Sequence, residues 1–229
     1  MVRVDREARK AIAEKLVKWY EIKGRQFSWR KEGLEPYHIL IAEMMLQKTR
    51  AEMVERVYRD FLGKYPNPQT LAAATVEEIA SCLKPLGLYN RRARWMKVIS
   101  ETLVSRYQAK LPKEKKDLMD LPGIGAYIVH AILCFAYDKP VPLVDVNVAR
   151  VLGRVASIEV SGDIRRNRKL HKVAAELVPK KKFKEFNWAL VDLGALVCTS
   201  KNPKHHDCPI ASFCKFAAIE KLKNKCKKI

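Results

Sequence analysis

Residues 118–127 read Leu-Met-Asp-Leu-Pro-Gly-Ile-Gly-Ala-Tyr. This stretch joins a short helical segment to a longer apolar one through the turn Pro122-Gly123-Ile124-Gly125. Two glycines allow the backbone to turn tightly and to approach a ligand closely. The helix that follows presents its N-terminal N–H groups to an anion. The stretch therefore predicts a helical hairpin that binds phosphate, with an ordinary helix–helix turn as the alternative.

The remainder of the chain has the same helical character. Apolar residues recur at helical spacing along most of it, and no convincing alternating strand pattern is present. Thr75 followed by Glu78 is a capping box, which predicts the start of a helix. We therefore predict an all-α fold. The predicted apolar stripes begin at Ile12, Val54, Ile79, Met96, Ile128, Val148, Leu170 and Phe186.

Prolines suggest where the chain passes from one lobe to another. In Lys139-Pro140-Val141-Pro142, two prolines separated by one residue prevent a helix from forming. We expect one helical lobe, which contains the hairpin, over residues 30–140. Residues 1–29 and 141–229 would form the second lobe.

The charge of the chain indicates a polyanionic partner. Its 45 Lys and Arg residues against 25 Asp and Glu residues give a net charge of +20, as expected for binding to nucleic-acid phosphates. A solvated basic surface is the alternative. No run of about 18 apolar residues predicts a membrane span. Residues 1–10 are charged and lack the apolar core of a secretion signal, so we expect a cytoplasmic or nuclear protein.

A second motif, Val-Asp-Val-Asn-Val-Ala-Arg-Val, occupies residues 144–151. Asp145 follows the proline break and opens a predicted helix, where aspartate is a favoured N-cap residue. The extended segment before it is long enough to bring Asp145 back toward the hairpin. Without other context, the N-cap interpretation is sufficient.

Six cysteines are distributed unevenly. Cys82 and Cys134 stand alone within apolar helical patterns and are predicted to be small core residues. The other four crowd the last 32 residues, which in a chain without a secretion signal indicates metal binding rather than disulfides. These four are Cys198, Cys208, Cys214 and Cys226.

Taken together, the hairpin and the Val-Asp-x-Asn motif about twenty residues later resemble the helix-hairpin-helix DNA glycosylases. That superfamily includes endonuclease III and the adenine and thymine–guanine mismatch glycosylases. Residues 27–30, 36–37 and 41–49 resemble the two mismatch branches in particular. The resemblance covers residues 15–215 and implies a monomer that acts on double-stranded DNA, in which the hairpin lobe is a six-helix barrel.

The resemblance implies catalytic roles for two carboxylates. Asp145 would stabilise the cationic sugar as the base departs, or activate the attacking water. Glu43 lies in the apolar stretch Ile-Ala-Glu-Met-Met-Leu, where burying a carboxylate is costly. It would face the flipped base and transfer a proton to it. A surface charge on one side of the helix is the alternative for Glu43.

The resemblance also implies DNA contacts. Gln47 would fill the gap left by the extruded base, although a solvated helix face is nearly as good an interpretation. Asn147 would help to orient the site and contact DNA. The hairpin would contribute Leu121, Gly123 and Gly125.

Tyr127 decides the branch within this resemblance. Bifunctional members carry a lysine here, which attacks the sugar and then nicks the strand, whereas tyrosine cannot form a Schiff base. Serine is typical of the adenine branch and tyrosine of the thymine–guanine branch. We also expect no further domain after the cysteines of the kind that adenine glycosylases carry. The resemblance therefore implies a monofunctional glycosylase for thymine, and for uracil, opposite guanine.

The cysteine cluster has the spacing Cys198-x6-His205-x2-Cys208-x5-Cys214. The family has four cysteines at this spacing, which hold a [4Fe–4S] cluster. Histidine stands here at the second position. His205 is the first choice as fourth ligand, with Cys226 and the adjacent His206 as alternatives, and a zinc site is a further possibility.

Two other functions remain open. An adenine glycosylase acting opposite guanine or oxidised guanine is favoured by Glu43 and Gln47 and opposed by Tyr127. A non-catalytic DNA-binding protein would keep the hairpin for phosphate contacts alone, and the presence of Asp145, Asn147 and Glu43 together opposes it.

Overall fold

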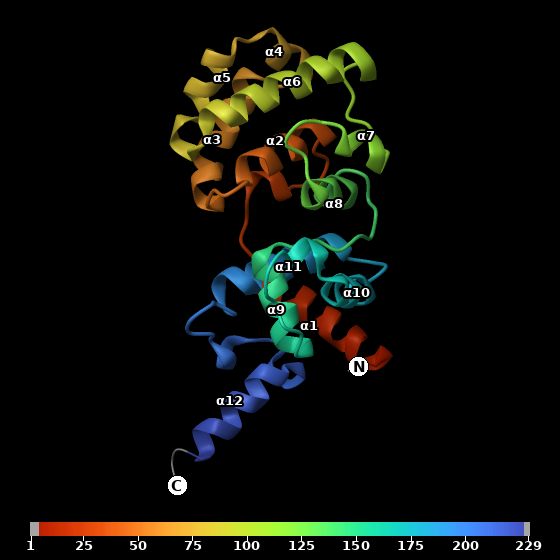
Figure 1. The fold of residues 1–229 in the computed structure, drawn as a ribbon, viewed down its shortest axis with the longest axis vertical. Coiled ribbons are helices and arrows are strands. Elements are labelled where there is room, and N and C mark those ends of the chain that lie inside the picture. The colour runs from red at the N-terminus through yellow and green to blue at the C-terminus, as the bar shows by residue number, and fades with distance from the viewer. Residues whose placement is uncertain (1–4, 227–229) are drawn as a thin grey trace. The chain divides into compact units, whose positions relative to one another are not determined.

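The computed structural model describes residues 5–226 and the side chains of residues 5–222. Over this range the chain forms α-helices and short 3-10 helices, with no β-strand (Figure 1), which confirms the predicted all-α class. The chain divides into two compact units. Unit 1 comprises Met1–Arg25 and Pro140–Ile229, and unit 2 comprises Gln26–Lys139. The hairpin lobe was predicted to begin at residue 30 and end at residue 140. Unit 2 begins four residues before the first of these limits and ends one residue before the second.

Unit 2 is built around the helix α2, which is buried along most of its length. A helix that is apolar on all sides belongs in a core, and α2 packs against α3 and α8. The long α6 packs across α4 and α5, and α7 packs on α8. The helices of unit 2 are α2 (Pro36–Leu46), α3 (Ala51–Lys64), α4 (Pro68–Ala73), α5 (Val76–Leu83), α6 (Tyr89–Tyr107), α7 (Lys115–Met119) and α8 (Ala126–Phe135).

The predicted capping box opens α5. The Thr75 hydroxyl accepts from the Glu78 N–H at 3.2 Å, and the Glu78 carboxylate accepts from the Thr75 N–H at 2.8 Å. Two N–H groups that the helix cannot satisfy internally are thereby paired.

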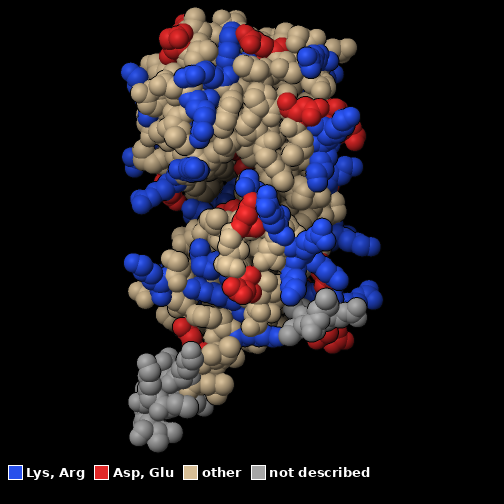
Figure 2. Space-filling view, in the orientation of Figure 1, with Lys and Arg blue, Asp and Glu red and all other residues tan. Residues whose placement is uncertain are grey.

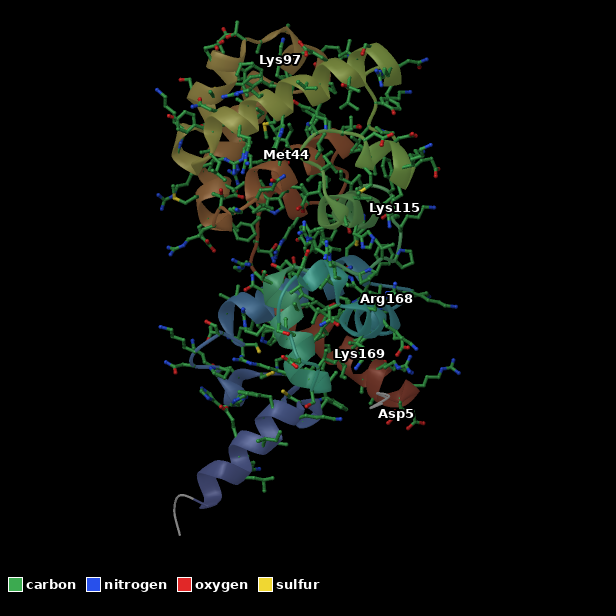
Figure 3. All side chains as sticks on the ribbon, viewed as in Figure 1. Asp5, Met44, Lys97, Lys115, Arg168 and Lys169 are labelled. Atoms are coloured by element: carbon green, nitrogen blue, oxygen red, sulfur yellow. The ribbon has the colours of Figure 1, made fainter. Side chains whose placement is uncertain are left out.

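Figure 3 shows Met44 of α2 among the helices of the unit and Lys115 at the outer side of α7.

Unit 1 is a second bundle with its own apolar core. Within it, α11 packs against α1 and α9, α10 packs against α9 and α1, and α12 packs against α9. The carboxylate of Asp192 is fully buried in α11 and accepts from the backbone N–H of Arg25 at 2.8 Å and from its Nε at 2.9 Å. The helices are α1 (Arg6–Lys23), α9 (Val146–Ala156), α10 (Arg168–Leu177), α11 (Phe183–Leu196) and α12 (Lys215–Cys226).

On the face shown in Figure 2, Lys and Arg side chains are more abundant than Asp and Glu, in keeping with the net charge. In the described part of the chain no helix combines the length and apolar character needed to cross a membrane.

Of the two cysteines predicted to be core residues, Cys134 is buried and Cys82 is only half-buried. The prediction for Cys82 is therefore correct only in part, because this residue lies at the edge of the unit 2 core.

Candidate active site and cluster-binding segment

The hairpin forms as predicted from the sequence, with α7, the turn and α8 in succession. Gly123 has φ +76°, and a Cβ atom built on it would lie 2.5 Å from Cε3 of Trp95. Gly125 is the N-cap of α8, and nothing lies within 4 Å of a Cβ built there. Only glycine combines the left-handed φ of residue 123 with this close approach.

Leu121 is a member of the core rather than of the surface. Its side chain is 3% exposed and packs in the unit 2 core. The hairpin therefore turns the side chain of this leucine inward. That Leu121 binds DNA stays a prediction, and the burial of its side chain leaves such a contact to the backbone.

Gln47 is connected directly to the hairpin. It follows the last residue of α2, and its Nε2 donates to the carbonyl oxygen of Gly123 at 3.0 Å. Both residues are close in space although they are far apart in the sequence. The turn and the end of α2 therefore form one surface of unit 2.

Arg92 holds this surface together, although no sequence pattern identified it. This residue of α6 is buried, and desolvation lowers its pKa. Its guanidinium donates to the carbonyl oxygens of Met44 and Gln47, both at 2.9 Å, and to that of Gly87. A buried cation is stable only with such partners. The guanidinium of Arg92 thus fixes the end of α2 against the loop before α6.

Gln47 is surrounded by further residues that no sequence pattern identified. Leu88 lies in that loop with φ +51°, a left-handed conformation that is uncommon for residues other than glycine. Its side chain is 49% exposed. The guanidinium of Arg91 lies 5.0 Å from the ring centroid of Trp95. The residues that line one small cavity with Gln47 are Lys48, Leu88, Arg91, Arg92 and Trp95. An exposed leucine among cations fits a surface for stacked bases and phosphates, but no sequence pattern distinguished it.

The two remaining predicted residues of unit 2 are on α2 and α8. Glu43 is 5% exposed, so its alternative interpretation as a surface charge is wrong. Tyr127 is the second residue of α8, half-buried against the unit 2 core.

In unit 1, Asp145 is the N-cap of α9. Its Oδ1 accepts from the Val148 N–H at 2.7 Å, and its Oδ2 accepts from Nδ2 of Asn147 at 3.1 Å. The N-cap interpretation is therefore confirmed, and Asn147 orients the same carboxylate. The side chain of Asp145 remains half-buried rather than enclosed.

Arg150, one turn further along α9, links this carboxylate to the cysteine segment. Its Nη2 donates to Oδ1 of Asn147 at 2.9 Å, and its Nε donates to the backbone oxygen of Cys198 at 2.8 Å. A Cβ atom on Gly194 of α11 would lie 2.8 Å from Cβ of Asn147. The absence of a side chain at Gly194 therefore allows α9 and α11 to approach closely here.

The predicted cluster ligands line one cavity. Its walls include Cys198, His205, Cys208 and Cys214. Burial raises the pKa of Cys208 to about 11 and also raises the pKa of Cys214. In the described residues no three carboxylate, thiol or imidazole groups are arranged to hold a metal ion. Three thiols and an imidazole around a common space nevertheless fit a cluster, which takes each ligand on a different iron.

The structure distinguishes the candidates for the fourth position. His205 lines the cavity, whereas the side chain of His206 is 81% exposed and lies beside Asp207. Cys226 ends α12, and its side chain lies outside the described residues.

Comparisons with known proteins agree with these features. Residues 41–180 match the model of the HhH-GPD superfamily of base excision DNA repair proteins, and residues 198–214 match the iron–sulfur binding domain of endonuclease III. A thymine/uracil-DNA glycosylase of Pyrobaculum aerophilum is 40% identical over 203 residues, which cover 86% of this chain and 87% of that protein.

Two further matches complete the comparison. An adenine DNA glycosylase of Mycolicibacterium smegmatis is 36% identical over 197 residues, 86% of this chain and 66% of that protein. A solved structure of a thermostable thymine-DNA glycosylase superimposes with a TM-score of 0.85 at 31% identity, over 92% of this chain and 97% of that one.

Proposed function

The chain belongs to the HhH-GPD superfamily of base excision DNA repair proteins, and from this we propose that it hydrolyses the N-glycosidic bond of thymine or uracil mispaired with guanine. It acts as a monomer and leaves the abasic strand intact. The observation that carries this proposal is the position of the Asp145 carboxylate. One of its oxygens accepts a hydrogen bond from the Val148 N–H, and the other accepts one from the side-chain amide of Asn147.

Asp145 acts on the sugar. As the bond between C1′ and the base nitrogen breaks, its electron pair leaves with the base and positive charge develops on the sugar. A fixed carboxylate stabilises this charge and accepts a proton from the water that adds to C1′. Because Val148 and Asn147 hold both of its oxygens, Asp145 does not need to reorient during the reaction.

Glu43 acts on the departing base. It is buried on α2, one helical turn before Gln47, and donates the proton that the leaving base requires. Gln47 and the exposed Leu88 occupy the space that the extruded base vacates. Unstacking is least costly at a mispair, which contributes to the selection of the target.

The hairpin binds the backbone of the DNA. Gly123 and Gly125 allow a phosphate to approach the N-terminus of α8, where N–H groups and the helix dipole favour an anion. In unit 1, Asn147 orients Asp145 and contacts the DNA strand. The net charge of +20 strengthens these contacts in a salt-dependent way.

An iron–sulfur cluster, of the [4Fe–4S] type, is held by Cys198, His205, Cys208 and Cys214. When bound, it supplies cross-links that stabilise the segment from Cys198 to Cys214. Arg154 also contacts this segment, since its Nη1 donates to Sγ of Cys198 at 3.3 Å.

The test is a strand-cleavage assay on duplexes that carry T:G, U:G, A:G or A opposite oxidised guanine, with and without alkali. We expect release of thymine and uracil, and strand breaks only after alkali treatment. The 36% identity to an adenine glycosylase makes adenine removal the second candidate, and preferential cleavage of the adenine duplexes would support it. Binding without cleavage of any duplex would indicate a non-catalytic DNA-binding protein.

A further inference from the structure

His205 is held from outside the cavity by an acidic residue of α12. Its Nε2 lies 2.5 Å from Oε2 of Glu220, and the ring centroids of His205 and Phe216 are 5.9 Å apart. The guanidinium of Arg154, which donates to Cys198, covers the Phe216 ring at 4.7 Å. The imidazole is therefore fixed by contacts on two sides.

The contact with Glu220 decides which ring nitrogen is available to a metal. A neutral imidazole carries one N–H and one lone pair. When Nε2–H donates to the Glu220 carboxylate, the lone pair is on Nδ1, and the imidazole lines the same cavity as the thiols. A carboxylate on the second ring nitrogen commonly fixes the orientation of metal-bound histidines and raises their basicity.

We infer that Nδ1 of His205 is an iron ligand beside the three thiolates and that Glu220 is the positioning residue for this imidazole. The inference rests on the cluster of the proposed function. It adds a residue that lies beyond the matched segment, which ends at Cys214. It also excludes Cys226 from the ligand set.

This ligand set has a consequence for the reduction potential. A neutral imidazole in place of a thiolate makes the set one charge less negative, which favours the reduced cluster. Histidine ligands raise the potential of Rieske centres relative to all-cysteine ferredoxins. The variant His205→Cys should therefore have a lower midpoint potential than the wild type.

The experiment uses the full-length protein purified with its cluster from cells supplied with ¹⁵N-histidine. Pulsed EPR on the cluster in a paramagnetic oxidation state should detect a directly bound ¹⁵N in the wild type and in Cys226→Ala, and none in His205→Cys. Glu220→Gln should keep this coupling, because its amide oxygen accepts the same hydrogen bond. Glu220→Ala should release iron to a chelator about 10- to 100-fold faster than the wild type. Lys221→Ala, an exposed neighbour on α12, is the matched control.

Four results would overturn the inference. A wild-type cluster without nitrogen coupling, or loss of the cluster in Cys226→Ala, would place the fourth ligand elsewhere. Unchanged coupling and iron release in Glu220→Ala would remove the positioning role. Stoichiometric zinc instead of iron would contradict the whole ligand set. Base excision is measured on the same preparations and tests the proposed function separately. If the protein excises uracil but its cluster shows no nitrogen coupling, the proposed function stands and this inference is wrong.

Discussion

Arg150 donates to Oδ1 of Asn147 at 2.9 Å, while the amide of Asn147 donates to Oδ2 of Asp145 at 3.1 Å. The same guanidinium also donates to the backbone oxygens of Gly194 and Cys198, at 2.7 and 2.8 Å. One side chain therefore connects the proposed catalytic carboxylate to the first residue of the cluster-binding segment. Both ends of this connection belong to unit 1.

Arg150→Lys should slow base excision and weaken the retention of iron together. The two bonds come from different guanidinium nitrogens, Nη2 to Asn147 and Nε to Cys198. A lysine has a single ammonium and cannot place donors at both of these positions, so it should lose one of the two bonds. Each lost hydrogen bond of a charged group contributes about 1.5–3 kcal/mol. Single-turnover excision, iron content and thermal unfolding measure the effect. Arg165→Lys, at an exposed ion pair with Asp163, is the control and should change none of them. Normal excision by a variant that has lost its iron would show that the two ends are independent.

Asp145→Asn should reduce excision by about 10²- to 10⁴-fold, the contribution of a positioned acid or base. Asparagine is as good an N-cap as aspartate, so α9 and its bond from Val148 should be retained. The melting temperature and the affinity for a U:G duplex should therefore stay near those of the wild type. Near-normal excision by this variant would contradict the role of Asp145.

The two variants differ in how far the sequence could predict them. Asp145 follows a proline break, precedes a helical pattern and matches a known motif, so local signals and the resemblance both identified it. The partners of Arg150 come from α11 and the following segment, 44 and 48 residues away. No local pattern records such a contact. Helices could be predicted from periodicity, whereas the hydrogen bonds between them could not.

Gly123→Ala should destabilise the protein more than Gly33→Ala. Both glycines have φ near +75°, where an alanine costs about 1–2 kcal/mol. A Cβ atom at residue 123 additionally meets the Trp95 ring at 2.5 Å, whereas nothing lies within 4 Å of one at residue 33. Denaturant unfolding compares the stabilities, and DNA binding should fall only in Gly123→Ala. Equal effects of the two variants would show that the Trp95 ring yields to the extra methyl group.

Leu88→Ala should weaken excision without loss of stability. Because the side chain is 49% exposed, its removal leaves no cavity in the core. If it inserts into the duplex, burial of a leucine contributes about 1.5–3 kcal/mol, or about 10- to 100-fold in excision at limiting enzyme. Val98→Ala is the matched control, since Val98 is 47% exposed on α6. Equal activity of both variants would remove Leu88 from the DNA-binding surface.

Burial separates what the sequence could and could not predict about the site. Leu121 belongs to the hairpin motif but points into the core, and the motif alone does not reveal that direction. Leu88 belongs to no motif but is exposed beside Gln47. Arg92 appears in the sequence as one basic residue among many. Its burial, visible only in the structure, identifies it as the residue that fixes the end of α2.

Tyr127→Lys tests the absence of strand cleavage. The wild type should release the base and leave an abasic strand that breaks only after alkali. No lysine occurs between Lys116 and Lys139, so the hairpin and α8 contain no other amine nucleophile. The resemblance to bifunctional glycosylases implies that a lysine at residue 127 would stand where their attacking amine stands, and proximity alone should permit Schiff-base chemistry.

The measurement for Tyr127→Lys is a covalent protein–DNA adduct trapped by borohydride on a U:G duplex. We expect the adduct in Tyr127→Lys and not in the wild type or in Tyr127→Phe, which keeps the ring and supplies no amine. Lysine is a good helix former, so α8 should tolerate the change. Efficient trapping of the wild type would mean that another amine attacks the sugar. The protein would then be bifunctional, and Tyr127 would no longer support its assignment to the thymine–guanine branch.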